Sequence, residues 1–175
     1  MSHFAATPAI HFITSHYSDV TMTWKLRLTQ VTTMVAAAAA TCPSSYWKEY
    51  RGACYWVSDY LLHWEDVADV CTTVHPGAQL ASVHDVEQNA FLAGEVAGHG
   101  NTIRRHAWLG LHRDSGSSSW KWTDGTPYDF SLWFMNDPDK YGGNCVMLNW
   151  SQWGMWSAQD CESYPEYFMC TIAAT

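Results

Sequence analysis

The sequence predicts a single α+β domain in which two helices come before most of the strands. Apolar residues recur with helical spacing in two segments between residues 62 and 98, and short aromatic strands separated by turns follow from residue 107. Helices and strands that occupy separate stretches of a chain are typical of the α+β class. Six cysteines form an even set suited to disulfides, and the length of 175 residues suits one core.

The first expected elements are a hairpin and a helix. Aromatic residues over 45–57 surround a turn at Gly52, which predicts two short strands. Over residues 62–74 apolar side chains recur at steps of three and four, so we expect an amphipathic helix with Cys71 on its buried face. Pro76 lies beyond its end, as is typical of a helix stop.

A second helix is predicted after Asp85, because Asp85 and Gln88 have the spacing of a capping box. It stops in the glycine-rich residues 98–100. The side chains expected to face the core from this helix are those of Val86, Ala90, Phe91 and Leu92.

The rest of the chain alternates between short strands and turns. Strands are expected at residues 107–111, 120–122, 145–149, 154–157 and 167–170. Residues 125–144, here called the long loop, carry Asp and Asn side chains whose oxygens suit a hard cation. Core packing is the expected role of Trp64, Trp108, Trp120, Trp122 and Trp156. Trp133 and Tyr141 lie in the long loop, where packing is the favoured role and contact with a ligand the alternative.

The cysteines indicate disulfides and an oxidising compartment. They stand at positions 42, 54, 71, 145, 161 and 170, with no C-x-x-C pair and no zinc-finger spacing to histidine. Six cysteines allow fifteen pairings, and spacing alone does not choose among them. Because disulfides persist outside the reducing cytosol, we expect a secreted, extracellular protein; six buried thiols in a cytosolic protein are the alternative.

Two segments precede the predicted domain. Residues 1–21 contain no Lys or Arg and form an upstream extension of unknown role. Residues 22–40 have the order of a signal peptide, with a basic start, an apolar stretch and small residues at the end; a flexible Ala-rich leader is the alternative. The apolar stretch is too short to cross a bilayer, so no membrane span is expected, and the domain covers residues 41–175.

Composition and motifs argue against two classes of function. The net charge of −8 and the lack of basic clusters argue against a nucleic-acid partner, because phosphates are neutralised by stripes of Lys and Arg. Catalysis is not expected either, since the chain has no nucleophile elbow, P-loop or dinucleotide fingerprint.

From Cys42 to Cys170 the order of motifs resembles the C-type lectin-like domain family. Residues 108–111, Trp-Leu-Gly-Leu, are similar to the family's core strand, residues 64–71 to its first helix, and the cysteine count to its long form. The resemblance implies the C-type lectin-like fold, with two helices against small antiparallel sheets and a long irregular binding loop. It also implies three disulfides, Cys42–Cys54, Cys71–Cys170 and Cys145–Cys161.

The resemblance further implies carbohydrate binding through calcium, in which the bound ion leaves coordination positions open for vicinal sugar hydroxyls. The ligand-binding residues it implies in this chain are Asp137, Pro138, Asp139, Asn144 and Ser157. Among these, Asp137, Asp139 and Asn144 would be the calcium ligands, and Pro138 would be a cis proline. The alternative interpretation of the two acids is a pair of solvated side chains that flank a proline turn.

The chain departs from the family pattern around the expected ion. Gly143 and Asn144 stand where the family has an acid before the cysteine, and Ser157 and Ala158 stand where it has Asn and Asp. An alanine side chain cannot coordinate, and calcium takes six to eight oxygens. The expected calcium site is therefore a weakened one.

Two functions follow from the resemblance. The first is a secreted lectin that recognises glycans or glycoproteins in innate defence, with calcium as cofactor. The second is a calcium-independent domain that binds protein or another non-sugar ligand through the long loop. Asn149 begins a glycosylation sequon, expected at the turn of the last hairpin and away from the long loop. The sequence predicts no oligomeric state.

Overall fold

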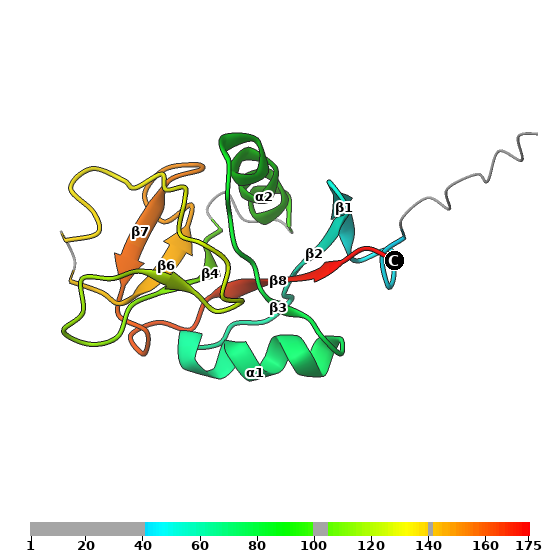
Figure 1. Cartoon of the computed structure of the whole chain (residues 1–175), viewed down its shortest axis with the longest axis horizontal. Helices are drawn as coiled ribbons and strands as arrows, with labels where there is room; N and C mark the ends of the chain where they lie inside the picture. Colours follow the sequence, from blue (N-terminus) through cyan, green and yellow to red (C-terminus); the bar gives the residue numbers. More distant parts are fainter. Residues whose placement is uncertain (1–40, 100–104, 140–141) are drawn as a thin grey trace, which may run out of the picture. The chain divides into compact units, whose positions relative to one another are not determined.

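The structure is a computed structural model that describes residues 41–99, 105–139 and 142–175. The predicted extension over residues 1–21, the predicted signal peptide over residues 22–40 and the loop residue Tyr141 lie outside the described residues. Figure 1 shows the order of the helices and strands along the described chain.

The first half of the domain forms as predicted. Strands β1 (Lys48–Tyr50) and β2 (Ala53–Val57) make the expected antiparallel hairpin. Gly52 at its turn has a φ of 80°, a left-handed conformation that glycine adopts without steric cost. Helix α1 (Trp64–Val74) follows, and β3 (Gln79–Leu80) then pairs with the last strand of the chain.

The strands join in one sheet. The remaining elements are α2 (Val86–Gly98), β4 (Ala107–His112), β5 (Lys121–Trp122), β6 (Cys145–Leu148), β7 (Trp156–Gln159) and β8 (Tyr167–Ala173). The strand order is β1-β2-β8-β4-β6-β7, with β3 added to β8 and β5 added to β4. All pairs are antiparallel except β4 with β8, which is parallel. The predicted α+β class and the two helices are confirmed.

The sheet carries a hydrophobic cluster on each face. Side chains alternate along β8, so that Met169 belongs to the cluster with Leu92 of α2, whereas Phe168 and Cys170 belong to the cluster with Val67 of α1. Figure 1 shows α1 and α2 on opposite sides of β8 and β2, in agreement with these two clusters. The two helices therefore cover different faces of the same strands.

The buried face of α2 differs from the prediction. Its buried residues are Asn89, Leu92, Ala93 and Val96. Val86, expected in the core, is 54% exposed. The difference arises from Asn89, a polar residue whose Oδ1 accepts a hydrogen bond from Trp156 Nε1 at 2.6 Å and whose Nδ2 donates to the carbonyl of Gly154 at 2.8 Å. Leu92 is buried and Phe91 packs against the same cluster, as predicted. The prediction missed Asn89 because it counted apolar residues only.

The predicted cap of α2 is half confirmed. Asp85 Oδ1 accepts a hydrogen bond from the backbone N–H of Gln88 at 2.7 Å, which lowers the pKa of Asp85 below its ordinary value. The side chain of Gln88 accepts from the backbone N–H of His84, one residue earlier than a capping box requires.

The tryptophans and cysteines follow most of the predictions. Trp108, Trp122 and Trp156 are buried, whereas Trp64 and Trp120 are only partly buried. The three disulfides implied by the resemblance are present, as Cys42–Cys54, Cys71–Cys170 and Cys145–Cys161. Among the described helices, neither has the length and apolar character needed to cross a membrane.

Candidate functional site

The middle of the long loop is fixed to β7. Trp133 forms an isolated β-bridge with Trp156. The backbone N–H of Phe134 donates to the Trp156 carbonyl, and the backbone N–H of Trp156 donates to the Leu132 carbonyl, both at 2.8 Å. The rings of Phe130 and Trp133 pack edge-on against Trp156, with centroids at 5.6 and 5.8 Å. Trp133 is thus a packing residue, as favoured from the sequence.

The beginning of the long loop is fixed by hydrogen bonds to Ser82 and His84, in the segment before α2. Ser82 Oγ donates to Asp124 Oδ2 at 2.6 Å, and Asp124 Oδ1 accepts from the backbone N–H of Thr126 at 2.9 Å. His84 Nδ1 lies 2.8 Å from Asp129 Oδ1, and this hydrogen bond lowers the pKa of Asp129 below its ordinary value. The segment before α2 therefore holds residues 124–129, where the long loop begins.

The predicted ligand residue Asp137 is bound to β7. The peptide bond between Asp137 and Pro138 is cis, as the resemblance implied. Ser157 Oγ donates to Asp137 Oδ2 at 2.7 Å, and Gln159 Nε2 donates to Ser157 Oγ at 2.9 Å. Ser157 and Gln159 are buried, and Ala158 between them is fully buried. The strand thus offers Asp137 a hydroxyl donor, and Ser157 acts as a structural partner of the carboxylate.

We expect Ser157→Ala to destabilise the domain by about 2 kcal/mol, because it removes two hydrogen bonds, one of them to a carboxylate, and leaves the Gln159 amide buried without its acceptor. Urea unfolding of both proteins measures the difference. The matched control is Ser163→Ala, an exposed position expected to change stability by less than about 0.5 kcal/mol. Equal midpoints for the two variants would show that the Ser157 hydroxyl contributes nothing.

The other predicted ligands, Asn144 and Asp139, lie beside a guanidinium. Arg113 directly follows β4, and its Nε donates to Asn144 Oδ1 at 3.0 Å. Its Nη1 lies 4.0 Å from Asp139 Oδ1, and its Cζ lies 4.8 Å from the ring centroid of Trp120. The Arg113 side chain is 14% exposed, whereas that of Asp139 is 91% exposed. The sequence prediction missed Arg113, since no motif or spacing marks it.

Gly143 has no room for a side chain. A Cβ atom at this position would lie 2.1 Å from the carbonyl carbon of Gln159 and 2.3 Å from its oxygen, both in the backbone of β7. The backbone N–H of Asn144 donates to that same carbonyl at 3.1 Å. The glycine is therefore required by the close approach of two backbones, and an acid could not stand there without moving β7.

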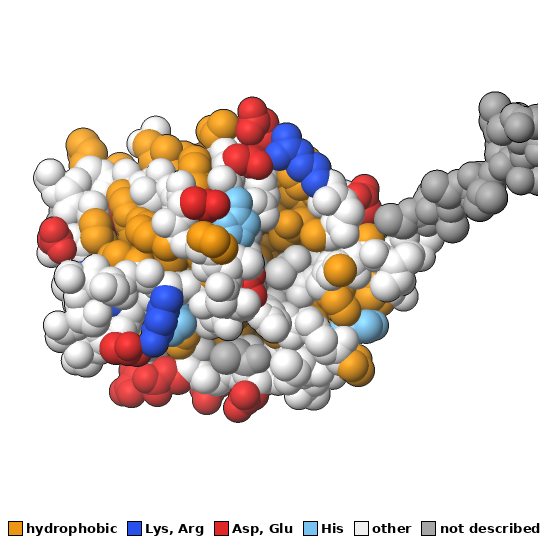
Figure 2. Space-filling model, in the orientation of Figure 1, with side chains coloured by type: hydrophobic (Ala, Val, Ile, Leu, Met, Phe, Trp, Pro, Cys, Tyr) orange, Lys and Arg blue, Asp and Glu red, His pale blue; other side chains and the backbone are white. Residues whose placement is uncertain are grey.

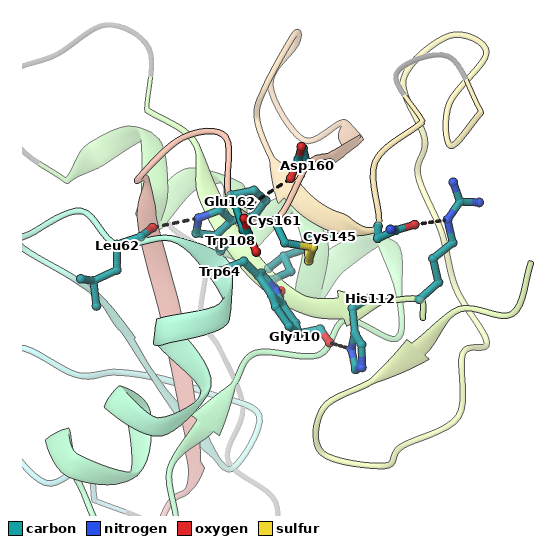
Figure 3. Close-up of a disulfide and its surroundings, with 12 residues drawn as sticks. Leu62, Trp64, Trp108, Gly110, His112, Cys145, Asp160, Cys161 and Glu162 are labelled. Atoms are coloured by element: carbon teal, nitrogen blue, oxygen red, sulfur yellow. Dashed lines mark hydrogen bonds between the residues drawn. A yellow bond between two sulfur atoms is a disulfide. The ribbon is translucent and has the colours of Figure 1, made fainter. Parts of the chain in front are cut away.

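The end of the long loop is stapled by the Cys145–Cys161 disulfide, shown in Figure 3 with Asp160 and Glu162 on either side of Cys161. The side chain of Trp64 lines a pocket together with both cysteines, and its ring lies 4.9 Å from the ring of His112. The residues that line the pocket beside this bridge include Glu65, Asn144, Asp160 and Glu162. The disulfide thus fixes Asn144 next to a negatively charged surface.

The donor set does not fit a calcium ion. Ser157 and Asp137 are hydrogen-bonded to each other, and the oxygen of Asn144 accepts from Arg113. A positive guanidinium beside Asn144 and Asp139 repels a divalent cation. Within residues 41–99, 105–139 and 142–175, no three His, Cys, Asp or Glu side chains are grouped to hold a metal ion. Calcium takes six to eight oxygens, and the hydrogen bonds of Asn144 and Ser157 commit side-chain oxygens that the ion would need.

An aromatic surface accompanies the long loop. Trp133 Nε1 donates to the hydroxyl of Tyr128 at 2.9 Å, and the ring of Trp120 lies 5.1 Å from that of Trp133. Tyr128 is 38% exposed and Met135 is 68% exposed. Figure 2, in the orientation of Figure 1, shows apolar side chains gathered over the part of this face where the long loop, β6 and β7 lie. Such a surface offers ring faces together with polar groups to a ligand.

Asn149 closes the turn between β6 and β7, the position predicted for the sequon. Its φ is 68°, its Nδ2 donates to the carbonyl of Ala93 at 3.0 Å, and its Oδ1 accepts from the Gly154 N–H at 2.7 Å. The side-chain amide thus joins the turn to α2. Glycosylation of Asn149 stays a prediction.

Comparison with known proteins establishes the family. The family model described as the Lectin C-type domain matches residues 60–172. Lectin BRA-3 of Megabalanus rosa is 33% identical over 141 residues, which cover 79% of this chain and 83% of that protein. C-type lectin BpLec of Bothrops pauloensis is 31% identical over 132 residues, covering 74% of this chain and 96% of that protein. The chain belongs to the C-type lectin domain family.

A solved structure has the same fold. It is the cow C-type carbohydrate-recognition domain of CD23, crystallised in the presence of GlcNAc2Man3 oligosaccharide. The two proteins are 28% identical and superpose with a TM-score of 0.66, over 78% of this chain and 98% of that one. This agreement confirms the C-type lectin-like fold that the sequence resemblance implied.

Proposed function

We propose that this protein is a secreted lectin that binds carbohydrate through the long loop, as a binding protein and not as an enzyme. The observation that carries the proposal is the loop itself. It is fixed to β7 at its middle and to the segment before α2 at its beginning, and it presents Asp139 and Tyr128 to solvent. A fixed loop with exposed oxygens and ring faces suits the hydroxyls and C–H faces of a sugar.

The family supports this proposal. Relatives named as lectins match most of the chain, and the CD23 domain with the same fold is described as a carbohydrate-recognition domain. Three disulfides suit the extracellular compartment that a secreted lectin occupies. Recognition of glycans in innate defence is the role that such a lectin would serve.

Two of the predicted ligand-binding residues have a different part in this proposal. Asp137 and Ser157 join the long loop to β7 through their mutual hydrogen bond. Of the segment Asp137-Pro138-Asp139, Asp139 is the exposed residue and remains available to a ligand. Since the donors do not fit calcium, we expect the sugar to bind without the ion.

The test is a glycan array probed with the secreted protein in calcium and in excess chelator. We expect glycan binding in both conditions. Binding that vanishes with the chelator would restore the calcium mechanism. No binding in either condition would favour the second candidate function, a non-sugar ligand such as a protein, which the exposed Met135 beside the aromatic surface favours.

Within this test, Asp139→Ala should weaken glycan binding about tenfold or more, because a hydrogen bond from a sugar hydroxyl to a charged oxygen is lost. Asp139 is 91% exposed, so the fold should not change. The control is Asp59→Ala, an exposed acid outside the long loop that pairs with His99. Titration on the best array glycan measures both, and equal affinities for the two variants would place the sugar site elsewhere.

A further inference from the structure

We propose that the guanidinium of Arg113 is the cation that organises the carboxyl-terminal half of the long loop, in place of a metal ion. The inference deepens the proposed function, since it concerns the same loop. It assigns to this chain a built-in positive charge, so that the binding surface keeps its shape without calcium.

Three separate segments meet at this guanidinium. Asn144 comes from the end of the long loop, Asp139 from the turn after the cis proline, and Trp120 from the residue before β5. Hydrogen bonding to Asn144, charge attraction to Asp139 and stacking on Trp120 act on different parts of one rigid planar group. A metal ion would join the same loop positions through oxygens alone.

Arg113 is held in position through both its main chain and its side chain. Its backbone N–H donates to the carbonyl of Asn144 at 2.9 Å, so the side chain and the main chain both bind one loop residue. The side chain is only 14% exposed, which reduces competition from water. The next residue, Asp114, accepts from Lys121 at 2.8 Å and therefore has its own cationic partner.

The same arrangement opposes a metal. A divalent ion near Asn144 would have to displace the Nε hydrogen bond and would face the guanidinium charge. The lack of room for a side chain at Gly143 removes one carboxylate from the same region. Both features act in one direction, because one adds a fixed cation and the other removes an anion that a free cation would need.

The test compares the full secreted chain with Arg113→Met, which keeps an apolar stem and removes the charge and the planar fork. Arg113→Lys keeps the charge alone. Lys121→Met is the control, since it removes a neighbouring cation that also pairs with an acid. Hydrogen exchange of the long-loop peptides is measured by mass spectrometry in millimolar calcium and in chelator, alongside glycan-array binding.

We expect wild-type exchange to be identical in calcium and in chelator. Arg113→Met should exchange about tenfold or more faster in the long loop in both solutions, the scale of one hydrogen bond to a charged group. Arg113→Lys should lie between them, and Lys121→Met should match the wild type. Glycan binding should weaken in the order of the exchange rates.

Protection of the wild-type loop by calcium would overturn the proposal, as would equal exchange for Arg113→Met and Lys121→Met. If Arg113→Met does not fold, the wild-type comparison in calcium and chelator and the Arg113→Lys variant still decide. The exchange data do not depend on a sugar. A wild-type protein that binds no glycan would refute the proposed function while leaving the role of Arg113 to be decided by exchange.

Discussion

Replacing Gly143 with alanine is expected to destabilise the domain by about 3 kcal/mol and to lower its melting temperature by on the order of 10 °C. The added Cβ would lie 2.1 Å from the carbonyl carbon of Gln159, far inside van der Waals contact. The atoms it meets belong to the backbone of β7, so no side-chain rotation relieves the contact. Either β7 or the end of the long loop must move.

The control for this variant is Gly94→Ala in α2. Gly94 is exposed, and a Cβ there meets nothing within 4 Å. Because alanine favours helix over glycine, this change should stabilise the domain by about 0.5–1 kcal/mol. Thermal and urea unfolding of both variants should therefore give shifts of opposite sign. A Gly143→Ala protein as stable as the wild type would mean that the backbone at Gln159 moves aside at little cost in free energy.

The result also bears on the calcium question. The resemblance places Gly143 and Asn144 where the family has an acidic ligand. The structure adds that an acid cannot stand at position 143 itself, because any side chain there meets the backbone of β7. At position 143, the missing carboxylate and the close packing of the loop against β7 therefore have the same cause.

Much of the fold could be predicted because it depends on local patterns. The helical spacing around Cys71, the hairpin at Gly52 and the alternation along the core strands each place their own side chains. The disulfide pairing could not come from spacing, and it needed the family resemblance. On α2 the prediction holds for Leu92, is wrong for Val86, and misses Asn89, which is buried for its hydrogen bonds and not for its hydrophobicity.

The candidate site was harder to predict because its contacts join distant residues. The resemblance implies Asn144 and Asp137 as ligands of one ion, and the structure shows a further partner for each: Asn144 binds Arg113, 31 residues earlier, and Asp137 binds Ser157, 20 residues later. A sequence motif shows which oxygens are present and does not show what else reaches them. Ser157, one of the ligand-binding residues that the resemblance implies, donates a hydrogen bond to the Asp137 carboxylate.

The largest loss of stability is expected when the Cys71–Cys170 disulfide is removed. The bridge closes a loop with a sequence separation of 99, so the double variant Cys71→Ala with Cys170→Ala should lose about 4.7 kcal/mol on the chain-entropy argument for a loop of about 100 residues. Both cysteines are fully buried and join α1 to β8, hence the missing sulfurs also leave space in that cluster.

The shorter Cys42–Cys54 bridge provides the comparison. Its sequence separation is 12, so Cys42→Ala with Cys54→Ala should lose about 3 kcal/mol, less than the long bridge. Urea unfolding measures both double variants, and the yield of purified protein reports a variant that no longer folds. A larger loss from the short bridge would show that local packing at β2 outweighs loop entropy. A larger loss from Cys71→Ala with Cys170→Ala, as expected, would mean that this bridge contributes more to stability than the short one. The reason is that it restricts the unfolded chain between the first helix and the last strand.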